Sequence, residues 1–295
     1  MAGSGQIRQL RRRIRSVKST QKITRAMEMI AASRILRAQR RVREARPYAE
    51  QITEVIKGLA VSNEVRNHRL LRAPEDAGRV AVVVNTSDRG LAGAYNANVL
   101  KLAERTIRQE EEAGREVELY VVGRKGAGYF AYRGRRPQAT WEGVSDRPIV
   151  EDANRIAGVV MERFSGDELE RVWLIYTDFR SSLNQIPARM ELLPVKPEEF
   201  EGGEEIAPEF MFEPDQAELL DRLIPRYVEA KVFHSLLESS ASEHASRQRA
   251  MKAATDNAQE VANSLSRVMN QARQDQITTE ISEIVGGAEA LVSRR

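Results

Sequence analysis

The chain has 295 residues, of which 41% are hydrophobic, 5% aromatic and 30% charged, and it contains no cysteine. The lack of cysteine excludes disulfides, thiolate zinc sites and cysteine nucleophiles, and the three scattered histidines make a histidine-rich metal site improbable. Sparse aromatic residues and abundant charges are typical of long helices rather than of one compact sphere.

The net charge of +3 conceals a strongly basic amino-terminal end. Residues 1–46 contain 14 lysines and arginines and 2 acidic residues, a balance of +12, so the rest of the chain carries −9. A basic segment of this strength indicates an acidic partner, which composition leaves open as nucleic acid, a membrane surface or an acidic protein.

The amino-terminal segment predicts one long helix. Residues 6–46 contain neither glycine nor proline, Ser4 is the expected N-cap, and Pro47 is the expected kink or boundary. One face follows the alternating three- and four-residue spacing of a heptad seam. The seam positions are Ile7, Leu10, Ile14, Val17, Gln21, Thr24, Glu28, Ala31, Ile35, Ala38, Val42 and Ala45.

The seam turns polar halfway along, at Gln21, Thr24 and Glu28. Beside these positions Ile23, Met27 and Ile30 form a second apolar stripe that points in another direction. A solvated helix face explains the polar residues, but it explains the neighbouring aliphatic stripe less well. We therefore interpret this stretch as one where the helix changes neighbours.

Residues 75–212 alternate strand and helix patterns. Strands are expected at 79–84, 117–122 and 171–176, and an edge strand at 184–195, because Pro187 cannot donate to a ladder. Helices are expected at 92–113, 125–132 and 151–164. This order predicts a small, mostly parallel Rossmann-like sheet, followed by an acidic loop at 196–209.

The carboxyl-terminal segment predicts a second long helix over 226–285, with an end or weak point at Gly286 and Gly287. Its seam repeats the spacing of the first, so the two helices are expected to pair with each other in antiparallel fashion. A homodimeric coiled coil, with one such helix from each chain, is the alternative.

Two glycine patterns raise the possibility of a phosphate site. Gly126, Gly128 and Ala131 match a dinucleotide-binding fingerprint, with Asp146 at the distance of its acidic residue. The pattern follows the second strand rather than the first, so tight packing of helix on sheet is the preferred interpretation.

The stretch 85–96 ("NTSDRGLAGAYN") places Gly90 and Gly93 between a strand and a helix, where an anion can bind. The lysine and hydroxyl residue of a P-loop are missing, so Asp88 and Arg89 are expected to brace the turn or to form a contact surface.

No nucleophile with a base and an orienting group stands out, and we expect no catalytic residue and no metal ligand in this chain. The basic helix is a weak candidate for binding nucleic acid, because its cations surround a seam that must pack and aromatic residues for base stacking are almost absent.

Several stretches resemble the gamma subunit of F-type ATP synthases, in the right order and over the whole chain. They are "TQKITRAMEMIAASR", "ARPYAE", "TSDRGLAGAYN", "FMFEPD", "RAMKAATDNA" and "ARQDQITTEISEIVGGAEAL". The sequence is identified on these motifs as a bacterial member of that family. The sequence departs from the usual residues of the family at three places. The turn "GLAGAYN" lacks the cysteine and the additional glycine that many members have, Asp275 stands where a small residue is common, and Gln248 replaces a usual methionine.

The resemblance implies an α/β fold with a long antiparallel coiled coil and a small Rossmann-like domain. The expected parts are a shaft helix at 1–60, the α/β domain at 75–212 and a second shaft helix at 213–295. The shaft stands inside a hexamer of alpha and beta subunits, and its foot contacts the epsilon subunit and the c-subunit ring. Rotation of the shaft then couples ion translocation to ATP synthesis on the beta subunits.

The same resemblance assigns contacts to individual residues. Arg273, Gln274 and Thr278 match positions that bind a catch loop of a beta subunit. Lys22, Arg25 and Met27 match positions beside the acidic lever of beta. Phe210 and Phe212 match aromatic positions at the c ring and epsilon foot.

The family further implies a peripheral protein at the cytoplasmic face of the bacterial membrane, with no membrane insertion, no bound nucleic acid and no cofactor of its own. Two other hypotheses stay open from the residues alone: a homodimeric coiled-coil scaffold and a Rossmann-like nucleotide-binding enzyme with helical arms.

Overall fold

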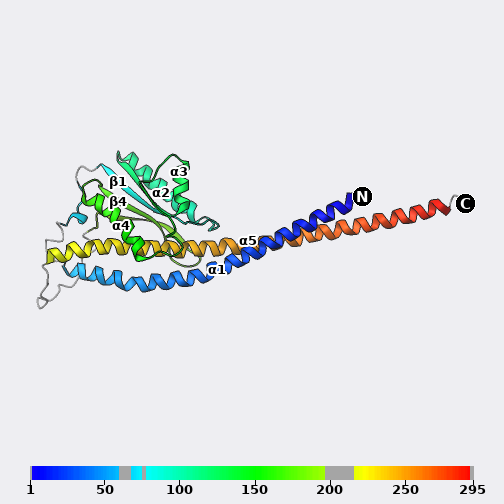
Figure 1. Cartoon of the computed structure of the whole chain (residues 1–295), viewed down its shortest axis with the longest axis horizontal. Helices are drawn as coiled ribbons and strands as arrows, with labels where there is room; N and C mark the ends of the chain where they lie inside the picture. Colours follow the sequence, from blue (N-terminus) through cyan, green and yellow to red (C-terminus); the bar gives the residue numbers. More distant parts are fainter. Residues whose placement is uncertain (1, 60–67, 75–77, 197–215, 293–295) are drawn as a thin grey trace. The chain divides into compact units, whose positions relative to one another are not determined.

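The computed structural model describes residues 2–59, 68–74, 78–196 and 216–292. The chain forms two compact units, one of Met1–Ile30 with Gln248–Arg295 and one of Ala31–Arg247. Figure 1 shows the elements in order. They are α1 (Ala2–Leu59), η2 (Arg69–Leu71), β1 (Arg79–Asn85), α2 (Tyr95–Glu112), β2 (Glu116–Val122), α3 (Arg124–Tyr132), β3 (Ala139–Trp141), α4 (Val150–Ser165), β4 (Arg171–Phe179), β5 (Gln185–Leu193) and α5 (Gln216–Val292).

The larger unit is built on a five-stranded sheet in the order β3-β2-β1-β4-β5. Strands β1 to β4 run parallel, with Val82 of β1 level with Leu119 of β2 and Trp173 of β4. Strand β5 joins the edge antiparallel to β4, and Pro187 lies on it. This arrangement confirms the predicted, mostly parallel sheet and the edge position of the strand that contains proline.

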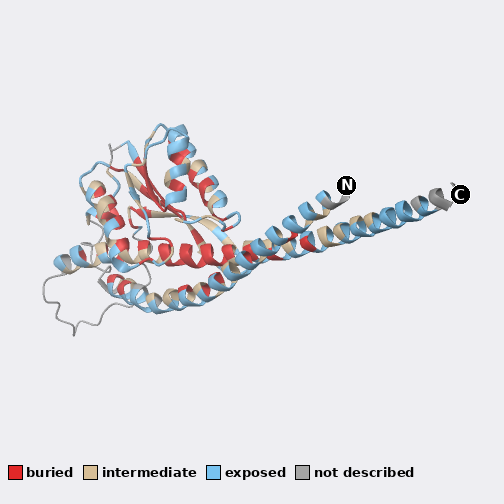
Figure 2. Cartoon of the chain, turned by 45° about the vertical axis from the view of Figure 1, so that its right-hand side comes forward, coloured by how far each residue is buried: buried red, intermediate tan, exposed pale blue. Residues whose placement is uncertain are grey.

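Helices cover both faces of the sheet, because alternate residues of β1 point to opposite sides. Val82 and Val84 pack with residues of α2 and α3, including Val99 and Phe130. Ala81 and Val83 pack in the opposite core. That second core draws on α4, α5 and the last turns of α1, where Ile52 and Ile56 are buried. Figure 2 shows the buried stripe of α5.

In the smaller unit, α1 and α5 pair in antiparallel fashion, as predicted. The Gln21 side chain donates to Gln259 at 2.7 Å, and the Thr24 and Thr255 hydroxyls share a hydrogen bond of 2.8 Å. The partner residue number falls as the α1 number rises, which fixes the antiparallel direction. Within this unit, the seam of α1 is therefore covered by α5 of the same chain.

Both long helices extend beyond the ends predicted from their glycine, proline and cap positions, and they lie within the bounds 1–60 and 213–295 that the family resemblance implies. Helix α1 begins at Ala2, before the expected cap at Ser4, and continues through Pro47 to Leu59. Helix α5 begins ahead of Pro225 and runs past Gly286 and Gly287 to Val292. The prolines cost helix stability, but buried apolar residues beyond them, such as Ile56 and Ile224, hold the neighbouring turns in the core.

The ends of the predicted strands and of the shorter helices agree with the structure within a few residues. Sequence reasoning missed β3 and η2, which have three residues each and therefore present no hydrophobic period. The expected loop at 196–209 lies outside the described residues except for its first residue.

Candidate functional site

The crevice where doubly wound folds bind ligands is filled by α5. In such folds the ligand lies beyond the carboxyl ends of the strands where the strand order reverses, here between β1 and β4. Asn85 at the end of β1 donates to Ser235 of α5 at 3.1 Å. The backbone of Thr177 in β4 receives the Ser242 hydroxyl and donates to the Ser239 hydroxyl, both at 3.3 Å.

Small hydroxyl residues allow this close approach. Ser235, Ser239 and Ser242 are buried, and their side chains satisfy polar groups of the strand ends that a ligand or water would otherwise meet. The space used for a nucleotide in related architectures is thus occupied by the chain itself.

The turn after β1 is held in place by two charged side chains of the chain itself, Asp88 and Arg247. The Asp88 carboxylate accepts backbone N–H groups of Arg124 at 3.2 Å and of Ser145 at 3.1 Å. The Arg247 guanidinium donates to the carbonyl oxygens of Arg89 and Gly90 at 3.1 and 3.3 Å. The expectation that Asp88 braces the turn is confirmed, while Arg89 contributes its backbone.

Arg247 belongs to a buried ion pair that sequence reasoning missed. Its guanidinium lies 2.5 Å from the Glu243 carboxylate, and the two side chains are 8% and 1% exposed. Burial raises the pKa of Glu243, and the adjacent Arg247 opposes that rise. The available signal was the four-residue spacing of Glu243 and Arg247 at the end of a serine-rich stretch that begins at Ser235.

The dinucleotide-like pattern on α3 serves packing. A Cβ atom added at Gly126 would lie 2.7 Å from both the Thr86 hydroxyl and a Val121 methyl, and the Gly126 N–H donates to that hydroxyl at 2.9 Å. The acidic residue of the predicted pattern, Asp146, forms an ion pair with Arg34. The preferred interpretation, tight packing of helix on sheet, is confirmed.

We expect Gly126→Ala to lower the free energy of unfolding by about 1–3 kcal/mol, because the added methyl group overlaps Thr86 and Val121. Gly128→Ala is the matched control on the same helix: its Cβ meets nothing within 4 Å, so alanine should be neutral or slightly stabilising. Urea unfolding followed by the fluorescence of Trp141 and Trp173 measures both. Equal effects of the two substitutions would contradict the packing role.

Three potential metal ligands, Asp146, Glu243 and His244, gather beside the crevice. Both carboxylates already face arginines, Arg34 and Arg247. Burial lowers the pKa of His244 to about 4. Its Nε2 atom lies 3.3 Å from the Asp146 carbonyl oxygen, which favours a proton on that nitrogen rather than a metal ion.

Glu238 makes the stability of the larger unit depend on pH. Burial raises its pKa to about 7, although a hydrogen bond from the Phe179 N–H at 2.5 Å works in the opposite direction. Since the folded pKa exceeds the unfolded value, the stabilising contribution is complete below about pH 4 and is lost as the pH rises to 7.

We therefore expect the free energy of unfolding to fall by about 2 kcal/mol between pH 4.5 and 7.5 through Glu238. Glu238→Gln should flatten this part of the pH profile, because the amide does not titrate. Urea titrations of both proteins across this range provide the measurement. A profile that keeps its slope in the variant would assign the dependence to other groups.

The residues predicted to contact a beta subunit lie in the smaller unit. Arg273, Gln274 and Thr278 are exposed on α5, with the Thr278 hydroxyl donating to the Gln274 carbonyl at 3.0 Å. Lys22 and Arg25 are exposed on α1, whereas Met27 is half-buried. Their contacts with partners stay predictions, and Phe210 and Phe212 lie outside the described residues.

The polar stretch of the seam keeps its inward position in the helix pair. Thr24 is buried, Gln21 and Glu28 are half-buried, and Gln21 and Thr24 bond to polar residues of α5. The second stripe points in another direction than the seam, as predicted, with Ile23 59% and Ile30 53% exposed. The neighbours that this stripe would contact stay a prediction.

The sequence compares closely with known proteins. A family model described as ATP synthase matches residues 6–291. The ATP synthase gamma chain of Frankia casuarinae is 47% identical, over 98% of this chain and 99% of the relative, and that of Thermobifida fusca is 48% identical over 98% and 97%. The chain belongs to the ATP synthase gamma-chain family.

Solved structures agree with this assignment. A chain from the Tetrahymena thermophila mitochondrial ATP synthase, in its central stalk and c-ring structure, is 26% identical with a TM-score of 0.60, covering 79% of this chain and 99% of that one. A chain of the Euglena gracilis mitochondrial ATP synthase shares the fold, with 19% identity, a TM-score of 0.68 and coverage of 98% and 95%. The chain has the role of the gamma, or rotor, subunit of an ATP synthase.

Within the described ranges, none of the helices combines the length and the apolar composition needed to cross a bilayer.

Proposed function

We propose that this chain is a rotating shaft that transmits torque between a membrane-embedded c ring and the catalytic beta subunits, and that it performs no chemistry itself. Its partners are then the alpha–beta hexamer, the epsilon subunit and the c ring, at the cytoplasmic face of a bacterial membrane. The observation that carries the proposal is the antiparallel pairing of α1 and α5 by Gln21–Gln259 and Thr24–Thr255. Two helices that share hydrogen bonds resist twisting better than either helix alone.

The outer faces of the helix pair suit contact with changing neighbours. Ile277, Ile281 and Ile284 are 46%, 57% and 71% exposed along α5, and an aliphatic row of this kind marks a protein contact. Lys22 and Arg25 on α1 are exposed cations that suit an acidic lever. Exposed charges attract at long range without fixing one geometry, which suits a surface that must pass several partners in turn.

The filled crevice supports a non-catalytic role with no cofactor of its own. Because α5 occupies the switch point between β1 and β4, a nucleotide would have to displace buried Ser239 and Ser242 from Thr177. In this proposal the nucleotides belong to the alpha and beta subunits.

Stoichiometry and rotation test the proposal. The native mass of the assembly should show one copy of this chain for every three alpha–beta pairs, whereas two copies in a free coiled coil would favour the scaffold hypothesis. The chain has no cysteine, so Arg136→Cys in an exposed loop provides a unique attachment point for a bead. With the hexamer immobilised, ATP should turn the bead in one direction. Sustained ATP hydrolysis by assemblies whose attached beads never turn would contradict the role of this chain.

A further inference from the structure

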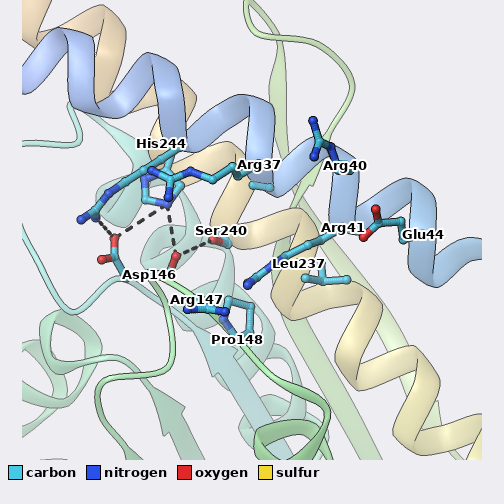
Figure 3. Close-up of a pocket in the computed structure, with 12 residues that line it drawn as sticks. Arg37, Arg40, Arg41, Glu44, Asp146, Arg147, Pro148, Leu237, Ser240 and His244 are labelled. Carbon is cyan, nitrogen blue, oxygen red and sulfur yellow. Dashed lines mark hydrogen bonds and ion pairs between the residues drawn. The ribbon is translucent and has the colours of Figure 1, made fainter.

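A basic pocket of about 490 Å³ opens in the larger unit between α1, residues 146–148 and α5. Figure 3 shows its lining. Five arginines line the pocket, accompanied by only two carboxylates, Glu44 and Asp146. The arginines are Arg34, Arg37, Arg40, Arg41 and Arg147.

One carboxylate of the pocket is already neutralised. Asp146 forms an ion pair with Arg34, and its backbone carbonyl faces His244. No ion pair of Glu44 occurs among the residues that the structure describes, and Glu44 lies one helical turn from Arg41 on α1. The lining therefore carries an excess of positive charge, because its arginines outnumber its carboxylates. His244 does not add to this excess, since burial lowers its pKa to about 4 and keeps the ring neutral.

Two arginines of this excess line the pocket from different segments of the chain. Arg41 belongs to α1 and Arg147 to the segment 146–148, while Arg40 points away from the other labelled residues (Figure 3). Neither Arg41 nor Arg147 has a carboxylate partner in the described ranges. Like charges that line one pocket repel each other, and the repulsion is strengthened by the apolar floor of Leu237 and Pro148, both buried.

We propose that this pocket binds a compact phosphate-bearing anion between Arg41 and Arg147. Guanidinium groups bind phosphate through paired N–H donors in a fixed plane. A phosphate group presents oxygens in several directions, so it can accept from arginines of two different segments at once. A carboxylate presents two oxygens along one edge, which matches a single arginine better. The geometry thus favours a phosphate over an acidic peptide, and the phosphate can belong to a free oligophosphate or to a lipid headgroup.

Calorimetric titration of the full chain with inorganic pyrophosphate tests the site. We expect saturable binding of one pyrophosphate per chain that weakens with added salt. The double variant R41Q/R147Q should bind at least about tenfold more weakly, because it loses two charge-assisted contacts. R43Q is the matched control: it removes one charge from the same helix on an exposed side chain that does not line the pocket, so its affinity should change by less than about twofold. Circular dichroism checks that all three proteins fold.

Competition distinguishes the two phosphate sources. Sedimentation with phosphatidylglycerol vesicles that requires Arg41 and Arg147, and that pyrophosphate reverses, would assign the site to a lipid headgroup. Pyrophosphate binding without such sedimentation would assign it to a free anion. The proposal is overturned if pyrophosphate does not bind, if R41Q/R147Q binds it as well as R43Q does, or if only an acidic peptide of aspartate and glutamate binds in the Arg41- and Arg147-dependent way.

Discussion

Replacing Arg247 by methionine is expected to lower the free energy of unfolding of the Ala31–Arg247 unit by about 3–5 kcal/mol. The substitution keeps much of the side-chain volume but leaves the Glu243 carboxylate, 1% exposed, without its cation. It also removes the donors to the carbonyl oxygens of Arg89 and Gly90, so the turn after β1 loses its anchor on α5. With its countercharge gone, Glu243 should have a still higher pKa, and the loss should grow as the pH rises.

Urea unfolding followed by tryptophan fluorescence measures this loss, because the two tryptophans of the chain, Trp141 and Trp173, lie on strands of the larger unit. Arg222→Met is the matched control. Arg222 pairs with Glu218 at the same spacing and the same 2.5 Å distance on α5, but the two side chains are 69% and 52% exposed. Its loss should cost less than about 1 kcal/mol.

A second control separates the cost of an unpaired charge from the cost of lost packing. The double variant E243Q/R247M removes both charges, so it should recover a large part of the stability that Arg247→Met loses. If Arg247→Met cost no more than Arg222→Met, or if E243Q/R247M recovered nothing, the ion pair would not be the determinant of stability at this site.

The double substitution Arg273→Ala and Gln274→Ala is expected to reduce ATP-driven ion pumping by the assembled complex by about tenfold or more. Both side chains are exposed on α5 and so are available to a beta subunit, as the proposed catch contact requires. A hydrogen bond that involves a charged group contributes about 1.5–3 kcal/mol, which corresponds to roughly tenfold or more in an equilibrium. ATP hydrolysis and ion pumping, measured on the same reconstituted vesicles, give the coupling ratio.

Asn270→Ala with Gln271→Ala provides the control for this prediction. These two residues are exposed on the same helix, one turn before the proposed contact, and replacing them changes the helix surface to a similar extent. The control should assemble and pump normally. Unchanged assembly and coupling in the Arg273 and Gln274 variant would count against the catch role of these residues, while the assignment of the chain to its family would stand.

The polar stretch of the seam shows what a local sequence pattern predicts and what only tertiary contacts reveal. The heptad spacing predicted which residues of α1 face inward, and Thr24 is buried as that spacing requires. The spacing did not show what Thr24 meets, because Thr255 lies 231 residues away in the sequence. A polar residue in a seam is stable when its partner is polar, and only the folded pair reveals the partner.

The buried Glu243–Arg247 pair illustrates a similar limit. A Glu and an Arg four residues apart on a helix most often form a solvated surface pair, as Glu218 and Arg222 do. The burial of Glu243 and Arg247 depends on the sheet and on the turn after β1, whose carbonyl oxygens accept hydrogen bonds from the Arg247 guanidinium. Likewise, the glycines of α3 match a nucleotide-binding pattern. The structure explains Gly126 in another way, because Thr86 and Val121 lie too close to leave space for a side chain.

By itself the sequence determined the two long helices and the mostly parallel sheet between them, because these follow from short-range periodicity and from glycine and proline positions. It predicted the antiparallel pairing of the helices, but the structure decided between this pairing and a homodimer's coiled coil. Its motifs also pointed to the gamma-chain family, in which the comparisons place the chain. Only the tertiary structure decided that α5 fills the crevice between β1 and β4 and that the helices continue past Pro47 and Pro225. It also brought Arg41 and Arg147 into the lining of one pocket. These features depend on contacts between residues far apart in the chain, and such contacts leave no period in the sequence.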